Sequence, residues 1–121
     1  MDFNINGNIW NIELVTEAEL LELYRKREDD EARYCFGVTL YPEHKILVNK
    51  EMCYDQILKT LRHELTHCWI WNSGLFNVPN YTEEMVCDLV SCVGPRIENV
   101  IKEFEYINKS KLNIKIGEVN G

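Results

Sequence analysis

The sequence predicts a small α+β domain in which strands come first and helices follow. Three observations support this. Segments that alternate apolar and polar residues occupy much of the first fifty positions, and apolar residues at spacings of three and four dominate the remainder. No repeat or low-complexity linker divides the 121 residues. We therefore expect a single domain, residues 1–121, with a core of its own.

The first strand region is expected close to the N-terminus. Residues 3–14 alternate apolar and polar side chains around an Asn6-Gly7 turn signal, which predicts a hairpin or a bent strand. Thr16 and Glu19 then form a capping-box pattern, and apolar residues at helical spacing follow. A first helix over about residues 16–28 is predicted.

A second pair of strands is expected over residues 36–41 and 46–48, which alternate or carry β-branched side chains. Pro42-Glu43-His44 interrupts them and predicts a turn. The acidic run at residues 28–31 is interpreted as a solvated helix end or loop.

Three helices are expected in the remainder. The first has Asp55 as its N-cap and stops at Asn72-Ser73-Gly74. The second is capped by Thr82 and broken by Gly94-Pro95, and the third begins with Pro95 in its first turn. Their apolar positions are expected to be buried: Ile57, Leu58, Leu61, Leu65, Cys68 and Trp69; Met85, Val86, Leu89, Val90 and Val93; Ile97, Val100, Ile101 and Phe104. The alternating pattern of residues 112–116 is compatible with either a short edge strand or a disordered tail.

Composition narrows the class of protein. A formal net charge of -7 argues against nucleic acid as the main partner, since phosphate binding needs clustered Lys and Arg. No apolar run is long enough for a membrane span, and the N-terminus lacks a signal-peptide pattern, so a cytoplasmic protein without membrane contact is expected. The five cysteines form an odd set without a Cys-x-x-Cys pair, and we interpret them as reduced thiols, mostly in the core.

A metal-binding motif, His63-Glu64-Leu65-Thr66-His67, lies within the most regular of the predicted helices. Residues four apart lie on the same face of a helix, so the imidazoles of His63 and His67 can converge on one ion. Glu64 lies beside that ion without having to bind it, and can take a proton from a water molecule. The polar stripe containing these residues borders the apolar one, as expected at the floor of a cleft.

Two histidines leave a zinc site incomplete, and Glu84 is the candidate third ligand. Asp88, four residues later on the same predicted helical face, could accept the free N–H of a ligand imidazole and so fix its tautomer. Another interpretation stays open, because acidic residues are favoured in the first turn of any helix. That preference alone would account for Glu83 and Glu84.

The combination of His63-Glu64-x-x-His67 with Glu84-x-x-x-Asp88 resembles the gluzincin metallopeptidases, whose third zinc ligand is a Glu. With residues 37–41 and 46–49 preceding the motif, the chain resembles minimal members of the ImmA/IrrE-like family, which are cytoplasmic zinc peptidase domains frequent in phages and mobile elements. The resemblance covers about residues 3–95. It implies a zincin-like fold, with a small mixed or antiparallel sheet packed on the active-site helix and on a following Glu-bearing helix. It also implies a polypeptide substrate, which the strand at 45–49 would bind at the rim of the cleft by β-augmentation.

The chain departs from the family in two respects: it has no room for the accessory domain of the larger members, and its oxyanion donor is not marked by a motif. Gluzincins supply a Tyr or His donor for the oxyanion, and no motif here places one. Tyr41, His44 and Tyr81 are candidates, although the turn position of His44 predicts an exposed loop residue. Cys68 and Cys87 lie next to predicted site residues and are interpreted as packed thiols.

The sequence thus predicts a monomeric zinc-dependent endopeptidase. His63, His67 and Glu84 would bind Zn2+, Glu64 would be the general base, and Asp88 would orient a ligand imidazole. The alternative is a peptidase-like binding or regulatory module of a mobile element, with a bound zinc and no turnover.

Overall fold

The computed structural model describes residues 1–26, 36–74 and 82–120, with the backbone alone at 24–26 and from 109 onward. The chain forms two compact units, Met1–Asn77 and Val78–Gly121. The first holds a four-stranded sheet with two helices, and the second is helical throughout its described part. The helix α1 lies between β2 and β3, and the other helices follow the last strand, so the strands do not all come first as predicted. The mixed structure with a small sheet agrees with the α+β class predicted from the sequence. Tyr81, Cys35 and the acidic run 28–31 lie outside the described residues.

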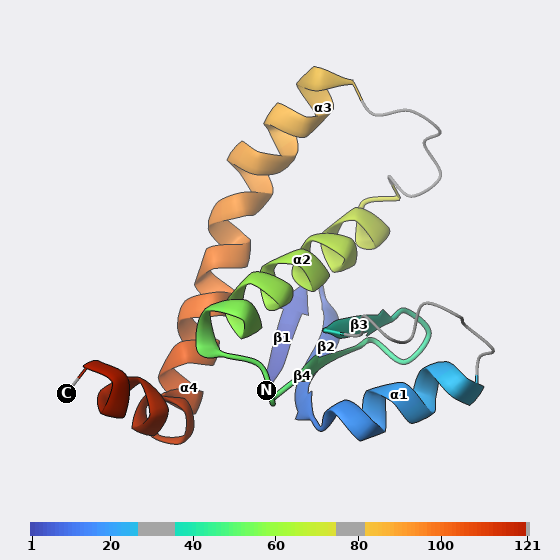
Figure 1. Ribbon diagram of the computed structural model, residues 1–121. Coiled ribbons are helices and arrows are strands. Elements are labelled where there is room, and N and C mark those ends of the chain that lie inside the picture. The colour runs from blue at the N-terminus through green and yellow to red at the C-terminus, as the bar shows by residue number, and fades with distance from the viewer. Residues whose placement is uncertain (27–35, 75–81, 121) are drawn as a thin grey trace. The chain divides into compact units, whose positions relative to one another are not determined.

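The sheet has the order β1-β2-β4-β3 (Figure 1). Its strands are β1 (Asp2–Ile5), β2 (Asn8–Val15), β3 (Gly37–Leu40) and β4 (Lys45–Asn49). β2 and β4 are parallel, while the two outer pairs, β1 with β2 and β3 with β4, are antiparallel. The sheet is therefore mixed, and β1 and β3 are its edge strands.

The N-terminal segment is a hairpin and not a bent strand. Ile5 pairs with Asn8 across a two-residue turn, in which Asn6 has φ 51° and Gly7 has φ 90°. Positive φ at both central residues defines a type I′ turn, whose twist matches that of the flanking strands. The Asn4 side chain accepts a hydrogen bond from the Gly7 backbone N–H at 2.8 Å and closes the turn.

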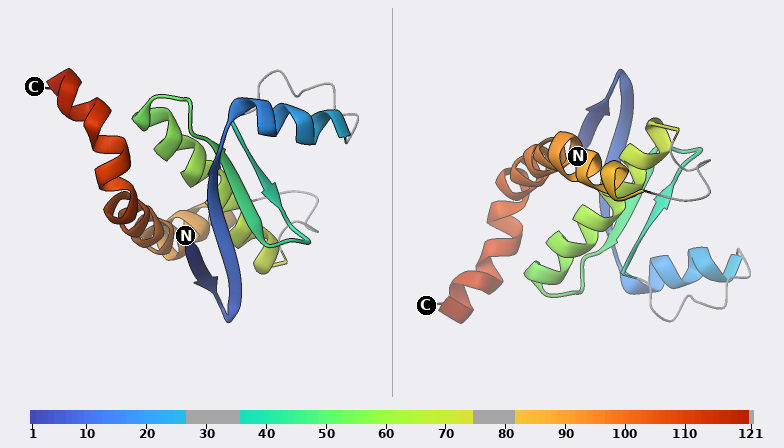
Figure 2. Two further views of the ribbon diagram at one scale, coloured as in Figure 1. Left: turned by 90° about the horizontal axis from the view of Figure 1, so that it is seen from below. Right: turned by 90° about the horizontal axis from the view of Figure 1, so that it is seen from above.

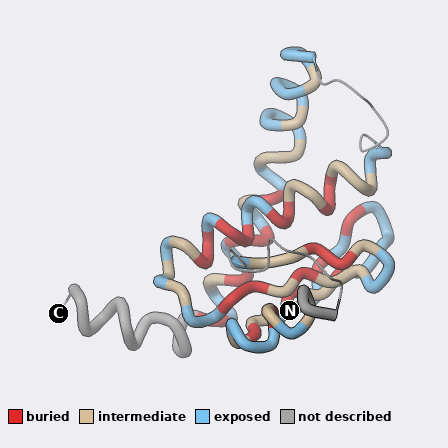
Figure 3. The backbone as a smooth tube through the Cα atoms, turned by 45° about the vertical axis from the view of Figure 1, so that its right-hand side comes forward, coloured by how far each residue is buried: buried red, intermediate tan, exposed pale blue. Residues whose placement is uncertain are grey.

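The sheet buries apolar residues on both faces, as the register and the alternation of side chains require. One face packs against α2 (Tyr54–Asn72) and carries Phe3, Trp10, Ile12, Ile46 and Val48, all buried. On the opposite face, Leu20 of α1 (Glu17–Lys26) packs with Val15, Val38 and Leu47. Figure 3 shows the buried positions along α2 and the strands.

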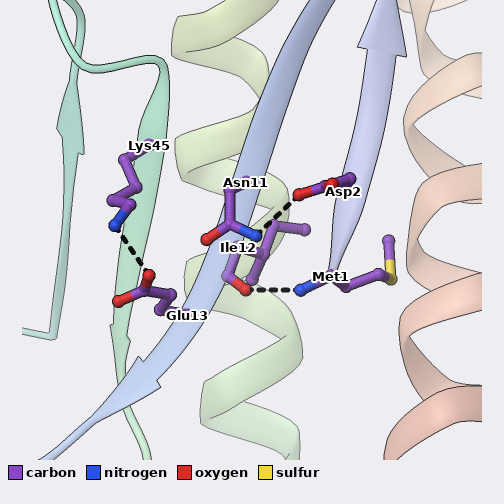
Figure 4. Close-up of polar contacts among 6 residues, drawn as sticks. All are labelled: Met1, Asp2, Asn11, Ile12, Glu13 and Lys45. Atoms are coloured by element: carbon purple, nitrogen blue, oxygen red, sulfur yellow. Dashed lines mark hydrogen bonds and ion pairs between the residues drawn. The ribbon is translucent and has the colours of Figure 1, made fainter.

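The face opposite α2 becomes polar away from α1 (Figure 4). Asn11 donates to the Asp2 carboxylate at 2.8 Å, and Lys45 forms an ion pair with Glu13 at 2.7 Å across the parallel strands. The Met1 nitrogen donates to the Ile12 carbonyl at 2.8 Å and extends the β1–β2 ladder. These contacts lie on solvated surface, so the apolar core on this side is confined to the α1 end of the sheet.

Helix α2 ends as predicted and begins two residues earlier than predicted. Ser73 is its C-cap, and Gly74 follows at φ 74° with its N–H bonded to the Trp71 carbonyl. At the other end the N-cap is Cys53, in an extended conformation, and Asp55 lies in the first turn. The N-cap prediction for Asp55 was wrong because a first-turn acid, which the helix dipole favours, has the same sequence pattern as a cap.

Beyond its N-cap Thr82, the described part of the second unit is one continuous helical segment. Thr82 caps α3 (Glu83–Asp88), its hydroxyl accepting from the Met85 N–H at 3.2 Å, as predicted. A π-helical turn, Leu89–Val93, then leads directly into α4 (Gly94–Asn120). The break predicted at Gly94-Pro95 is absent. Proline removes one hydrogen bond and crowds the preceding turn, and the wider π turn accommodates it without ending the helix.

Two further predictions for this unit were wrong. Residues 112–116 are neither a strand nor disordered, since α4 continues through them. None of the residues 83–93 is buried, and Val86 and Val90 are 48% and 65% exposed. The described part of this unit provides no second layer to cover them. By contrast, Ile97, Val100, Ile101 and Phe104 of α4 are buried as predicted. No helix in the described ranges is long and apolar enough to span a membrane.

The cysteines are mostly outside the core, contrary to the prediction. Of the four in the described ranges, all free thiols, Cys68 is buried, whereas Cys53, Cys87 and Cys92 are exposed. Helical spacing predicted the side for Cys68 because α2 packs on a sheet, and it failed for Cys87 because no residue of α3 is buried.

Candidate metal centre

His63, Glu64 and His67 come together on α2, as their spacing predicts. The two Nε2 atoms lie 3.1 Å apart, and the imidazole rings meet edge to face, with centroids 4.8 Å apart and an interplanar angle of 77°. The nearest donor atoms of all three side chains lie within 4.8 Å of one another. This group could hold a metal ion.

The spacing of the two nitrogens fits a tetrahedral ion. Two ligands at about 2.0–2.1 Å from a tetrahedral ion are about 3.3 Å apart, close to the observed separation of the Nε2 atoms. A metal ligand must also be a neutral imidazole. Burial, followed by the charge on His63, lowers the pKa of His67, which favours the neutral ring at physiological pH.

Glu64 is the most unusual member of the group, because it is only 6% exposed while His63 is exposed. The Thr39 hydroxyl lies 3.3 Å from Glu64 Oε2 and 3.4 Å from its carbonyl oxygen, and can donate to either. Burial raises the pKa of the Glu64 carboxyl, and the neighbouring His63 and the Thr39 hydroxyl oppose this rise in part. A raised pKa brings the pH at which a carboxyl exchanges its proton closer to neutral.

The burial of Glu64 results from the close approach of β3 to α2. A Cβ atom added to Gly37 would lie 2.8 Å from Thr60 Cγ2 and 2.9 Å from the Leu47 carbonyl oxygen, so only glycine fits at this crossing. Thr60, one helical turn before Glu64, is likewise buried at 6% exposure. The polar stripe predicted on α2 is therefore divided: Thr60 and Glu64 lie under the strand, and His63 lies outside it.

A cavity of about 330 Å³ opens at this crossing, beside the histidine pair. Its walls come from the start of β3 and from two turns of α2, and its lining residues are Phe36, Gly37, Gln56, Lys59, Thr60, His63 and Glu64. The cleft predicted next to the motif is thus present. It gives Glu64 access to solvent despite the burial of most of its side chain.

The strand at 45–49 does not form the rim of the sheet. β4 is hydrogen-bonded to β2 on one side and to β3 on the other, so it has no edge at which a peptide could pair. The edge strand next to Glu64 is β3. The predicted rim position of residues 45–49 was wrong because of the strand order. The chain leaves β2 by a long crossover, and β4 then lies between β2 and β3.

Two of the three candidate oxyanion donors lie in the described residues. His44 is not an exposed loop residue: its ring stacks on Trp10 with centroids 4.6 Å apart and meets Trp71 edge to face. Its φ of 52° is the left-handed conformation that aims the side chain at this cluster. Tyr41 stacks on Trp71, and Trp71 lies one helical turn after His67 on α2. The pKa of the Tyr41 phenol is raised, first by burial and then by the nearby Cys68 and Glu64. The phenol therefore stays protonated and can donate a hydrogen bond.

The two cysteines next to site residues differ. Cys68 is fully buried, and burial together with Glu64 raises the pKa of its thiol far above the usual range, so it is a packed, unreactive thiol as predicted. Cys87 is exposed, and the packing predicted for it was wrong.

Glu84 and Asp88 lie on α3, four residues apart, and both are exposed. They belong to the second unit, whereas His63, Glu64 and His67 belong to the first. It stays a prediction that Glu84 is the third metal ligand and that Asp88 accepts the free N–H of a ligand imidazole.

Sequence reasoning missed the part of the site that β3 contributes. Gly37 and Thr39 are two residues apart in an alternating segment and so share the face that meets α2. That periodicity was available in the sequence, but nothing local said which helix the face would meet. Gln56 and Lys59 lie one helical turn or more before His63 and had no motif to mark them.

No protein-family model matches the chain, and no curated protein or solved structure is significantly similar to it. The residues of the site are therefore what indicates a function for this chain.

Proposed function

We propose that this chain is a zinc-dependent endopeptidase in which Glu64 is the general base. The observation that supports it most is the buried carboxyl of Glu64 beside two imidazole nitrogens 3.1 Å apart. A largely buried carboxyl next to a metal-binding pair is costly for folding and has no structural partner beyond the Thr39 hydroxyl among the contacts found in the described residues. Such a group is typical of a site built for proton transfer.

In this proposal His63 and His67 bind the zinc, and Glu84 completes the protein ligands. When bound, zinc polarises water and the carbonyl of a peptide bond. Glu64 takes a proton from the attacking water at a carboxylate oxygen and then delivers it to the leaving amide nitrogen. The raised pKa of Glu64 suits both steps, because the carboxyl must accept the proton and give it up again.

Two neighbours would complete the site. Tyr41 is favoured as oxyanion donor over His44 because Glu64 is close enough to help raise the pKa of the Tyr41 phenol, which stays protonated and can donate a hydrogen bond. Asp88 would accept the free N–H of a ligand imidazole. The polypeptide substrate would pair with the outer edge of β3, the strand that covers Glu64.

Metal analysis and a single substitution test the proposal. The purified protein should contain about one zinc per chain, and the zinc-loaded protein should cleave members of a proteome-derived peptide library, with products read by mass spectrometry. Glu64→Gln should keep the zinc and reduce cleavage by about 100-fold or more. Glu51→Gln, an exposed carboxyl on the turn after β4, is the matched control and should cleave normally.

Each outcome is informative. Absence of zinc from the unmutated protein, or full activity of Glu64→Gln, would contradict the mechanism. A protein that holds zinc through His63 and His67 and cleaves nothing in the library would instead be a binding module.

A further inference from the structure

The cavity beside Glu64 has a polar and partly cationic lining that the proposed reaction does not use. Gln56, Thr60 and Glu64 are spaced by four along α2 and form one wall, while Lys59 and His63 form the neighbouring, more exposed wall. Phe36, which is 50% exposed, and Gly37 close it from the β3 side. All lining residues belong to the first unit.

Among the described residues that line the cavity, Lys59 is the only Lys or Arg. It is exposed, and no ion pair is found for it within the described ranges, whereas Lys45 on the same unit is paired with Glu13. The Gln56 side-chain amide is already engaged, since its nitrogen donates to the Thr60 hydroxyl at 3.0 Å. The described lining therefore carries one positive charge, on Lys59 at the exposed wall, in addition to the buried carboxyl of Glu64.

The two charged residues of the cavity, Glu64 and Lys59, differ in burial, since Glu64 is buried and Lys59 is exposed. Glu64 is covered by β3 and accepts from Thr39, while Lys59 lies one turn earlier and outward. A ligand that enters from solvent would meet the ammonium group first. The volume of about 330 Å³ is ample for one carboxylate-bearing side chain of a peptide.

We propose that this cavity is the side-chain pocket of the peptidase and that Lys59 makes it selective for an acidic residue, Asp or Glu, next to the cleaved bond. This inference rests on the proposed peptidase function and specifies its substrate class. Gly37 keeps the pocket open, since a side chain there would collide with Thr60 and the β4 backbone. Phe36 would contact the aliphatic part of the bound side chain at the mouth.

Cleavage specificity is the first test. In the peptide library, bonds flanked on one side by Glu or Asp should be cleaved about two- to fivefold faster than the matched Gln or Asn sequences, the factor expected of an exposed ion pair. Lys59→Glu should change the ratio of Glu to Lys cleavage by about tenfold in favour of Lys. Lys50→Glu, the same charge change on an exposed residue outside the cavity, should leave that ratio unchanged.

Binding to metal-free protein is the second test, and it does not depend on catalysis. Removing zinc with a chelator prevents a ligand carboxylate from binding the metal directly. Acetyl-glutamate N-methylamide should then bind about two- to fivefold more tightly than its glutamine and lysine analogues, with NMR shifts at the Gly37 amide, and added salt should reduce the difference. Thermal unfolding of each Lys59 variant verifies that it is folded.

The two tests separate the hypotheses. Lys59-dependent binding of the glutamate probe without any cleavage would support the pocket and overturn the peptidase. Cleavage with no acidic preference, or with a preference that Lys59→Glu leaves unchanged, would overturn the pocket and leave the peptidase standing.

Discussion

Glu64→Gln should stabilise the metal-free protein at neutral pH even though it removes the proposed activity. The Glu64 side chain is 6% exposed, and the one hydrogen bond found for its carboxylate is the long contact of 3.3 Å from Thr39. An ionised carboxylate can accept at about four positions, so most of its hydration is lost without replacement. Glutamine has nearly the same shape and carries no charge.

The expected gain follows from these contacts. A buried polar group left without partners costs about 1–3 kcal/mol, and more when it is charged. The Thr39 hydroxyl and the neighbouring His63 recover part of this cost, and the new amide also needs a partner. We therefore expect about 1–2 kcal/mol of added stability for Glu64→Gln at pH 7.

The gain should depend on pH. Burial raises the pKa of Glu64 above its value in the unfolded chain, so the folded state holds its proton to higher pH. The contribution of Glu64 to the free energy of unfolding is therefore most favourable below the pKa that Glu64 has in the unfolded chain. It is lost as the pH rises through the pKa of Glu64 in the folded state. The advantage of Gln should be absent below about pH 4 and complete once the folded carboxyl has ionised.

Urea denaturation followed by tryptophan fluorescence measures this effect. All three tryptophans, Trp10, Trp69 and Trp71, lie in the first unit, so the signal reports the unit that contains Glu64. Glu51→Gln, at an exposed position, should change stability by no more than about 0.5 kcal/mol. If Glu64→Gln is less stable than the unmutated protein at pH 7 with chelator present, the carboxyl is better solvated than the structure indicates.

Three further predictions concern the metal and two glycines. His67→Ala should weaken zinc binding by more than about 100-fold, measured by competition with a chromogenic chelator, and an unchanged affinity would mean that the ion is held elsewhere. Gly37→Ala should lower the free energy of unfolding by about 1–3 kcal/mol in urea denaturation, because its Cβ meets Thr60 and the Leu47 carbonyl. Gly94→Ala, at a helical position with open space around its Cβ, should instead raise it by up to about 1 kcal/mol. Gly7 has φ 90°, so Gly7→Ala should lower the free energy of unfolding by about 1–2 kcal/mol. An unchanged stability would argue against the type I′ turn.

Local signals predicted the elements of the first unit well. The Asn6-Gly7 turn, the Thr16 capping contact to the Glu19 N–H and the stop after Asn72 are each interactions within a few residues of sequence. The structure has all three. The pairing of His63 with His67 is local in the same sense, since a helix brings residues four apart together whatever surrounds it.

Predictions that needed knowledge of a distant partner were less successful. The spacing of Val86 and Val90 predicted a buried face, but the described part of their unit has no layer to cover it. His44 followed a proline in a turn and was expected in solvent, yet its ring packs against Trp10, more than thirty residues away in sequence. Periodicity identifies an apolar or aromatic face and does not identify what lies opposite.

The sequence by itself determined the pairing of the two histidines, because the spacing of His63 and His67 and the geometry of a helix are sufficient to bring two imidazoles together. Only the tertiary structure decided the state of Glu64. Its burial requires β3 to cross α2 at Gly37, and this depends on a sheet order in which β4 lies between β2 and β3. Solvation of a carboxyl, and hence its pKa, is set by groups that come close only when the chain has folded.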